Sequence, residues 1–111
     1  MNNFSVDVVV AGEATIIAAV GQLDVASISV LQSAMASIIA TDGSVIVDLT
    51  QLTFIDSAGL SSLVAGRRAA ALVGCRFTVR GAQGAVADVL EQTGIGAMLR
   101  NAHEPPEISR N

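Results

Sequence analysis

The stretch VIVDLTQLTFIDSAGL, residues 45–60, decides the fold of this chain. The segment Ser44–Leu49 is a short run of aliphatic residues, as in a strand buried on both faces. Such a strand is expected in the centre of a sheet covered by helices. The next segment, Thr50–Asp56, predicts a loop, and a helix is expected to begin at about Ser57. The stretch therefore predicts a buried strand that delivers an Asp-Ser pair to the start of a helix.

Upstream of this stretch the pattern predicts a hairpin and one helix. Alternating apolar residues indicate two strands, Phe4–Ala11 and Ala14–Val20, separated by a turn at Gly12 and Glu13. A helical period then extends over Val25–Ala40, and Asp24 or Ser27 could cap its start. The buried stripe of that helix is predicted to contain Ile28, Leu31, Ala34, Met35 and Ile38.

Downstream, a helix, a strand and a second helix are expected. The helix from Ser57 should end near Val73, with its buried side formed by Leu60, Leu63, Val64 and Ala71. The segment Cys75–Arg80 predicts a strand and Gln83–Thr93 a helix, with Gly94 as a left-handed cap. One more apolar turn is expected from Ile95, Met98 and Leu99.

The resulting order is β-β-α-β-α-β-α, which predicts the α/β class with a mixed β-sheet covered by helices. The chain has 111 residues, enough for one domain with its own core. We expect residues 1–100 to form this single domain. Residues 101–111 are polar and contain Pro105 and Pro106, so they predict a flexible C-terminal tail.

Composition excludes several classes of function. The net charge is −4, and the six basic residues are all arginine, so no basic patch for nucleic acid is expected. No apolar run reaches the roughly 20 residues that span a bilayer. The single cysteine, Cys75, cannot form an internal disulfide. One cysteine and one histidine in the whole sequence are too few ligands for a structural zinc site. The N-terminus lacks a signal-peptide pattern. These features predict a cytoplasmic protein without a metal or other cofactor.

Ser57 has three possible roles from its residue type and position. It could simply cap the helix, because its side chain can accept bonds from the first backbone N–H groups. It could be a nucleophile, but the Gly-x-Ser-x-Gly elbow is only partly matched and His103 in the tail is the sole candidate base. It could also be a regulated residue, since small Ala58 and Gly59 leave its hydroxyl accessible.

The third role rests on a resemblance. Leu49-Thr50 and the segment Phe54–Leu60 closely resemble the phosphorylation-site signature of STAS domains that act as anti-sigma-factor antagonists. The segment Gly21–Asp24 is similar to the Gly-Glu-Leu-Asp loop of that family, with Gln22 in the place of Glu. Thr93–Ile95 resembles the Thr-Gly-Leu turn of the family after the third helix.

This resemblance implies a protein-binding module that is a substrate and has no catalytic activity of its own. It implies that Ser57 is the phosphorylation site and that Asp24, Asp56, Ser57, Ala58 and Gly59 form the partner-binding surface. The implied partners are an anti-sigma factor that is itself a serine kinase of the GHKL type, and a phosphatase. The unphosphorylated protein would capture the kinase and release a sigma factor, and any ATP and Mg²⁺ would belong to the kinase.

Two alternatives keep the STAS fold and change its role. The chain could be a STAS subunit of a stress-signalling complex or of a lipid ABC transporter, or a scaffold without phosphorylation. The tail also departs from the family pattern, because residues 101–111 show little of the short strand and final helix that family members usually add.

Overall fold

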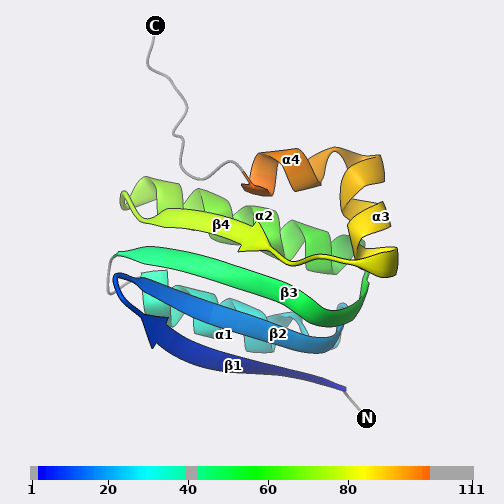
Figure 1. The fold of residues 1–111 in the computed structure, drawn as a ribbon, viewed down its shortest axis with the longest axis horizontal. Coiled ribbons are helices and arrows are strands. Elements are labelled where there is room, and N and C mark those ends of the chain that lie inside the picture. The colour runs from blue at the N-terminus through cyan, green and yellow to red at the C-terminus, as the bar shows by residue number, and fades with distance from the viewer. Residues whose placement is uncertain (1–2, 40–42, 101–111) are drawn as a thin grey trace, which may run out of the picture.

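The computed structural model describes residues 3–39 and 43–100. They form a four-stranded sheet with four helices (Figure 1). In chain order the elements are β1 (Phe4–Ala11), β2 (Ala14–Leu23), α1 (Ile28–Ile39), β3 (Ser44–Ile55), α2 (Ser57–Leu72), β4 (Arg76–Arg80), α3 (Gly84–Thr93) and α4 (Ile95–Arg100).

The predicted N-terminal hairpin is confirmed. β1 pairs antiparallel with β2, from Phe4 opposite Gly21 to Ala11 opposite Ala14. The two-residue connection contains Gly12 at a φ of 65°, and the primed turns of such hairpins require this positive angle. The hairpin forms one side of the sheet, so β1 is an edge strand.

The predicted mixed α/β sheet is also confirmed. The strand order is β1-β2-β3-β4, with β2, β3 and β4 parallel to one another. Parallel neighbours need crossover connections, and α1 and α2 supply them. Figure 1 shows both helices behind the sheet, while α3 and α4 lie beyond β4.

The core between the sheet and these two helices is almost entirely aliphatic. Leu60 and Leu63 of α2 are buried as predicted, whereas Val64 is half-buried and Ala71 is exposed. Ala70 and Gly66 occupy the core side instead. A methyl group on Gly66 would lie 2.7 Å from the sulfur of Met35, which shows how closely α2 approaches α1.

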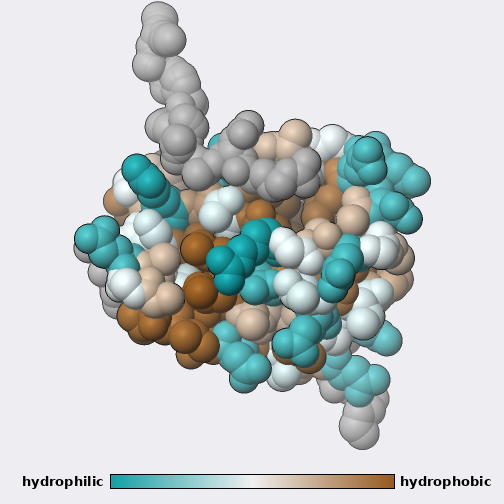
Figure 2. All heavy atoms as spheres, viewed as in Figure 1, coloured by the Kyte–Doolittle hydropathy of each residue, from teal (hydrophilic) through white to brown (hydrophobic). Residues whose placement is uncertain are grey.

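In the part of the chain that the structure describes, helical cover lies on one face of the sheet only, which corrects the expectation for the central strand. β3 is central, and its Val45 and Val47 are 1% and 0% exposed beneath the helices. Ile46 points to the opposite face and is half-buried. Figure 2 views this open face, where polar side chains lie beside an apolar area.

Three element boundaries differ from the sequence-based prediction by three residues or more. The second strand was predicted to end at Val20 but continues to Leu23, because residues 21–23 pair with β3. Thr50–Ile55 was predicted to be a loop but continues β3, because it pairs with the end of β2 after a register shift. The hydroxyl of Thr53 also donates to the carbonyl of Gly21 at 3.0 Å. The first helix begins at Ile28 and not at Val25, since residues 25–27 form a turn; its predicted end at Ala40 lies outside the described residues.

The C-terminal elements match their predictions closely. α3 ends at Gly94, which is left-handed with a φ of 75°, as expected of a glycine cap. The predicted apolar turn after it is α4, and its Leu99 is fully buried. The predicted tail, residues 101–111, lies outside the described residues.

Candidate functional site

The turn from β3 into α2 places Ser57 at the surface. Asp56 is the N-cap residue of α2, with extended backbone angles, and its Oδ1 accepts from the N–H of Gly59 at 2.9 Å. The interpretation of Ser57 as the cap is therefore wrong. Aspartate and serine both cap helices well, and here the chain turns one residue earlier, so that Ser57 is the first helical residue.

The hydroxyl of Ser57 makes no hydrogen bond to any residue that the structure describes, and the residue is exposed. Asp56 already occupies two donors of the first turn, because its carboxylate binds Gly59 and its carbonyl accepts from Leu60 at 2.9 Å. The N–H groups of Ser57 and Ala58 remain directed out of the helix start. The candidate base for a nucleophilic serine, His103, lies outside the described residues.

The second predicted part of the site, Asp24, lies in a turn before α1. Its Oδ1 accepts from the N–H of Ala26 at 3.1 Å and lies 3.1 Å from the hydroxyl of Ser27. That hydroxyl in turn accepts from the N–H of Asp24 at 2.9 Å and donates to the carbonyl of Gln22 at 2.8 Å. Ser27 is fully buried. The turn is thus held by its own side chains.

The structure brings the Asp24 turn and the Asp56 turn together. Leu23 and Ile55 are paired across β2 and β3, and the N–H of Asp56 donates to the carbonyl of Leu23 at 3.3 Å. A methyl group on Gly59 would lie 2.7 Å from that same carbonyl oxygen and 2.7 Å from Cγ1 of Ile55. Gly59 therefore lets the start of α2 rest directly on the Asp24 turn.

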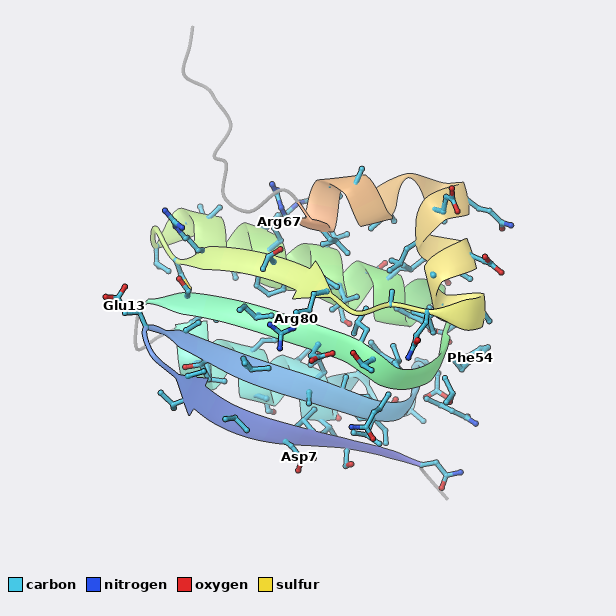
Figure 3. The ribbon with its side chains drawn as sticks, viewed as in Figure 1. Asp7, Glu13, Phe54, Arg67 and Arg80 are labelled. Atoms are coloured by element: carbon cyan, nitrogen blue, oxygen red, sulfur yellow. The ribbon has the colours of Figure 1, made fainter. Side chains whose placement is uncertain are left out.

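Two exposed hydrophobic side chains flank these turns and were missed in the sequence. Phe54 is 45% exposed and Val25 is 73% exposed. Phe54 projects from the end of β3 (Figure 3), and it pairs with Gln22 two residues before Asp24. The local pattern gave no sign of the exposure of Phe54, because a strict alternation along β3 would place Phe54 on the same side as the buried Leu52.

Asp48 forms hydrogen bonds and an ion pair with neighbouring residues of the sheet. Its Oδ1 accepts from the hydroxyl of Thr50 at 2.6 Å and from the N–H of Thr50 at 2.9 Å. Its Oδ2 forms an ion pair with Arg80 at 3.3 Å. The Thr50 hydroxyl is the main cause that lowers the pKa of Asp48, and Arg80 adds to the effect. Asp48, Thr50 and Arg80 form this set of interactions on the open face of the sheet.

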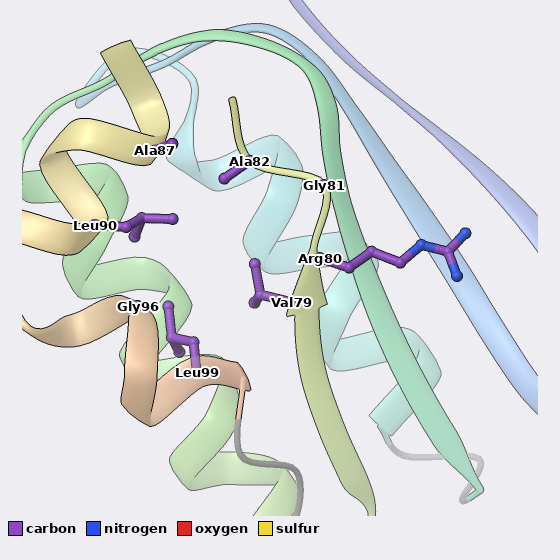
Figure 4. Close-up of a pocket in the computed structure, with 8 residues that line it drawn as sticks. All are labelled: Val79, Arg80, Gly81, Ala82, Ala87, Leu90, Gly96 and Leu99. Carbon is purple, nitrogen blue, oxygen red and sulfur yellow. The ribbon is translucent and has the colours of Figure 1, made fainter. Parts of the chain in front are cut away.

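One cavity of about 140 Å³ lies between β4, α3 and α4 (Figure 4). The side chain of Arg80 points away from it, across β3. The remaining lining residues are apolar or glycine: Val79, Gly81, Ala82, Ala87, Leu90, Gly96 and Leu99. The cavity thus offers no reactive side chain.

Residues 3–39 and 43–100 contain neither a candidate metal site nor a membrane-spanning helix. These residues contain no group of three potential metal ligands. No helix among them has the length and apolar character to cross a bilayer.

The architecture agrees with a comparison of the chain with known families. The family model described as STAS domain matches residues 5–106, which is most of the chain. The chain belongs to the STAS-domain family. Its resemblance to this family, and the fold that the resemblance implied, are confirmed.

Solved structures with the same fold include several anti-sigma factor antagonists. The STAS chain described here is 19% identical to an antagonist from Mycobacterium paratuberculosis, with a TM-score of 0.72 over 86% of this chain and 82% of that one. Unphosphorylated SpoIIAA gives a TM-score of 0.69 at 23% identity, over 85% and 83% of the two chains. Phosphorylated SpoIIAA from Bacillus gives 0.64 at 21% identity, over 85% and 86%. No curated protein matches the chain.

Proposed function

We propose that this STAS protein is an anti-sigma-factor antagonist that is switched by phosphorylation of Ser57. The observation that carries the proposal is the exposed hydroxyl of Ser57, which bonds to no described residue and lies at the first position of α2, next to the cap residue Asp56. The fold neighbours support it, because they include antagonists from two bacteria and SpoIIAA in both unphosphorylated and phosphorylated form.

The chemistry assigned to this chain is that of a substrate. The Ser57 oxygen would form a bond to the γ-phosphorus of ATP held by a GHKL-type serine kinase, while the bond to the β-γ bridging oxygen breaks and ADP leaves. The hydroxyl proton would pass to a base on the kinase, since no titratable group of the described chain is hydrogen-bonded to this hydroxyl. A separate phosphatase would hydrolyse the ester, and this chain needs no cofactor of its own.

The free protein should tolerate phosphate at Ser57. A phosphoserine adds about −1.5 to −2 charges at neutral pH. The N–H groups of Ser57 and Ala58 and the helix dipole favour an anion at this end of α2. In a complex the same dianion would lie beside the Asp56 carboxylate in a desolvated interface, where an uncompensated charge is costly. Phosphorylation should therefore weaken binding far more than folding.

The proposed contact surface comprises the two adjoining turns: Asp24, Asp56, Ser57, Ala58 and Gly59. Its apolar anchors would be Phe54 and Val25, the exposed hydrophobic residues beside it. Aromatic residues in the centre of an interface commonly contribute most of the binding energy. The partner would be an anti-sigma factor in the cytoplasm. Residues 1–100 would form the binding domain, and residues 101–111 would be a tail.

The decisive experiment is a calorimetric titration of the cognate kinase with wild-type protein, Ser57→Ala, Ser57→Asp and the phosphoprotein. We expect tight binding for the first two and weak binding for the last two. Equal affinity for all four forms would overturn the switch. The mass of protein from native cells, with and without phosphatase, tests whether Ser57 carries phosphate; stoichiometric recovery with a transporter ATPase would instead favour the transporter role.

A matched pair of truncations tests the proposed surface. Phe54→Ala should weaken kinase binding at least tenfold, because it removes an aromatic anchor. Leu72→Ala removes an even more exposed hydrophobic side chain, 87% exposed at the opposite end of α2, and should leave the affinity unchanged. Equal effects of the two truncations would place the contact elsewhere.

A further inference from the structure

The outer edge of β1 presents a row of backbone groups that no described residue pairs. β1 is hydrogen-bonded to β2 alone, at the end of the strand order. The carbonyl of Asn3 accepts from the N–H of Gln22 at 3.1 Å, so Asn3 directs its backbone toward β2. Because residues of an antiparallel pair alternate in this respect, Phe4, Val6, Val8 and Val10 direct their N–H and C=O groups outward.

The side chains along this edge are apolar and exposed. Val8, Val9 and Val10 are 49%, 53% and 73% exposed. Edge strands of soluble proteins usually carry lysine, proline or a bulge that prevents pairing with another chain. β1 has none of these, and its only charge is Asp7. Figure 2 shows hydrophobic side chains gathered over the hairpin end of β1.

We propose that this edge joins two copies of the chain through antiparallel β1–β1 pairing across a two-fold axis. The register places Val8 opposite Val8 of the second copy, and Val6 opposite its Val10. All the outward backbone groups of these three valines then find partners. Their side chains share one face, because alternate residues of a strand point the same way. The result is a self-complementary valine cluster, as a two-fold interface requires.

Charge selects this register over its neighbours. A shift by one pair in one direction would place Asp7 directly opposite Asp7 of the second copy, and like charges in that position are destabilising. In the proposed register Asp7 faces Val9 of the second copy, so no two charged residues of β1 lie opposite each other. A shift in the other direction would place Val6 opposite Gly12, beyond the end of the strand.

The proposed interface does not involve the Ser57 surface. Figure 3 shows Glu13 at the hairpin turn and Phe54 at opposite ends of the sheet. Pairing at Val8 and kinase binding at Ser57 can therefore be tested separately, and the failure of one does not affect the other.

Sedimentation of the full chain from about 10 to 500 µM tests the pairing, since self-association depends on concentration. Wild type should reach twice the chain mass of 11.3 kDa. Val8→Lys places two like charges across the two-fold axis and should remain a monomer, with the thermal midpoint of wild type at concentrations where wild type is also monomeric. The control Val73→Lys alters a valine that is 64% exposed at the end of α2 and should behave as wild type. A wild-type monomer over the whole range, or a dimer of Val8→Lys, would overturn the proposal.

A pair of cysteine variants tests the register. Opposed residues of a hydrogen-bonded pair have Cα atoms about 5.5 Å apart, which suits a disulfide. Val8→Cys should therefore give a covalent dimer with oxidised glutathione. Val10→Cys should not, because two Val10 residues would lie about 14 Å apart along the strands. Wild type, whose Cys75 is buried, is the blank. Efficient cross-linking of Val10→Cys, or none of Val8→Cys, would overturn the register.

Discussion

Two turns lie side by side at one end of the sheet, and each contains an aspartate and a serine. In the turn before α1, Ser27 is fully buried and its hydroxyl bonds to Asp24 and Gln22. In the turn before α2, Ser57 is exposed and only Asp56 is engaged, by the N–H of Gly59. The two turns contain the same residue types, yet Ser27 is buried and hydrogen-bonded whereas Ser57 lies at the surface.

This difference shows that a neighbouring aspartate does not by itself mark a reactive serine. What separates the two is the position of the aspartate relative to the helix. Asp56 caps α2, and its carboxylate accepts a hydrogen bond from the backbone N–H of Gly59. Asp24 instead directs its carboxylate at Ala26 and Ser27 within its own turn.

Ser27→Ala should have the largest effect on stability. It removes a buried hydroxyl and leaves the N–H of Asp24 and the carbonyl of Gln22 without their partner. Unsatisfied buried groups cost about 1–3 kcal/mol each, so we expect a loss of about 2–3 kcal/mol. Urea denaturation measures it, with the exposed Ser29→Ala on α1 as the control. A loss below about 0.5 kcal/mol would show that Ser27 does not hold this turn.

Gly59→Ala tests the contact between the two turns. The new methyl group would meet the Leu23 carbonyl and Ile55 at 2.7 Å, and backbone cannot move aside easily. We expect a loss of about 1–3 kcal/mol from overpacking. Gly66→Ala is the matched control in the same helix, because its methyl would meet the flexible Met35 side chain. An equal response of both variants to thermal denaturation would contradict the close contact at Gly59.

Much of the architecture was predictable because apolar periodicity follows burial. The hairpin, the α/β order and the core positions Leu60 and Leu63 came from that pattern. The second half of β3 could not be predicted from apolar periodicity, because Thr50 and Thr53 are polar. Its strand conformation depends on pairing with β2, which no local pattern reports.

The arrangement of the candidate site was predictable only in part. Ser57 and Asp24 were predicted to share one surface, and the structure brings their turns together. Both Asp56 and Ser57 are good helix caps, so residue type could not decide between them. The burial of Ser27 and the exposure of Phe54 depend on how β2 and β3 pack at this end of the sheet. Such tertiary features are absent from a local pattern.

Asp56→Ala should have a moderate effect, because it removes the cap of α2. Loss of a capping side chain costs about 1 kcal/mol. Asp56→Asn keeps an oxygen acceptor for the N–H of Gly59 and should stay within about 0.5 kcal/mol of wild type. Chemical denaturation of both variants gives the difference. Equal losses would mean that the negative charge, and not the hydrogen bond, is what stabilises the start of α2.

Ser57→Ala should have the smallest effect on stability and the sharpest effect on modification. The side chain is exposed and its hydroxyl bonds to no described residue, so the free energy of unfolding should change by less than about 0.5 kcal/mol. Alanine is also a good residue for the first turn of a helix. Incubation of both proteins with the cognate kinase and ATP should phosphorylate wild type once and the variant not at all, as read by intact mass. Ser27 cannot substitute, because its hydroxyl is buried and fully bonded. A large loss of stability in Ser57→Ala would make Ser57 a structural residue like Ser27, and the contrast between the two turns would disappear.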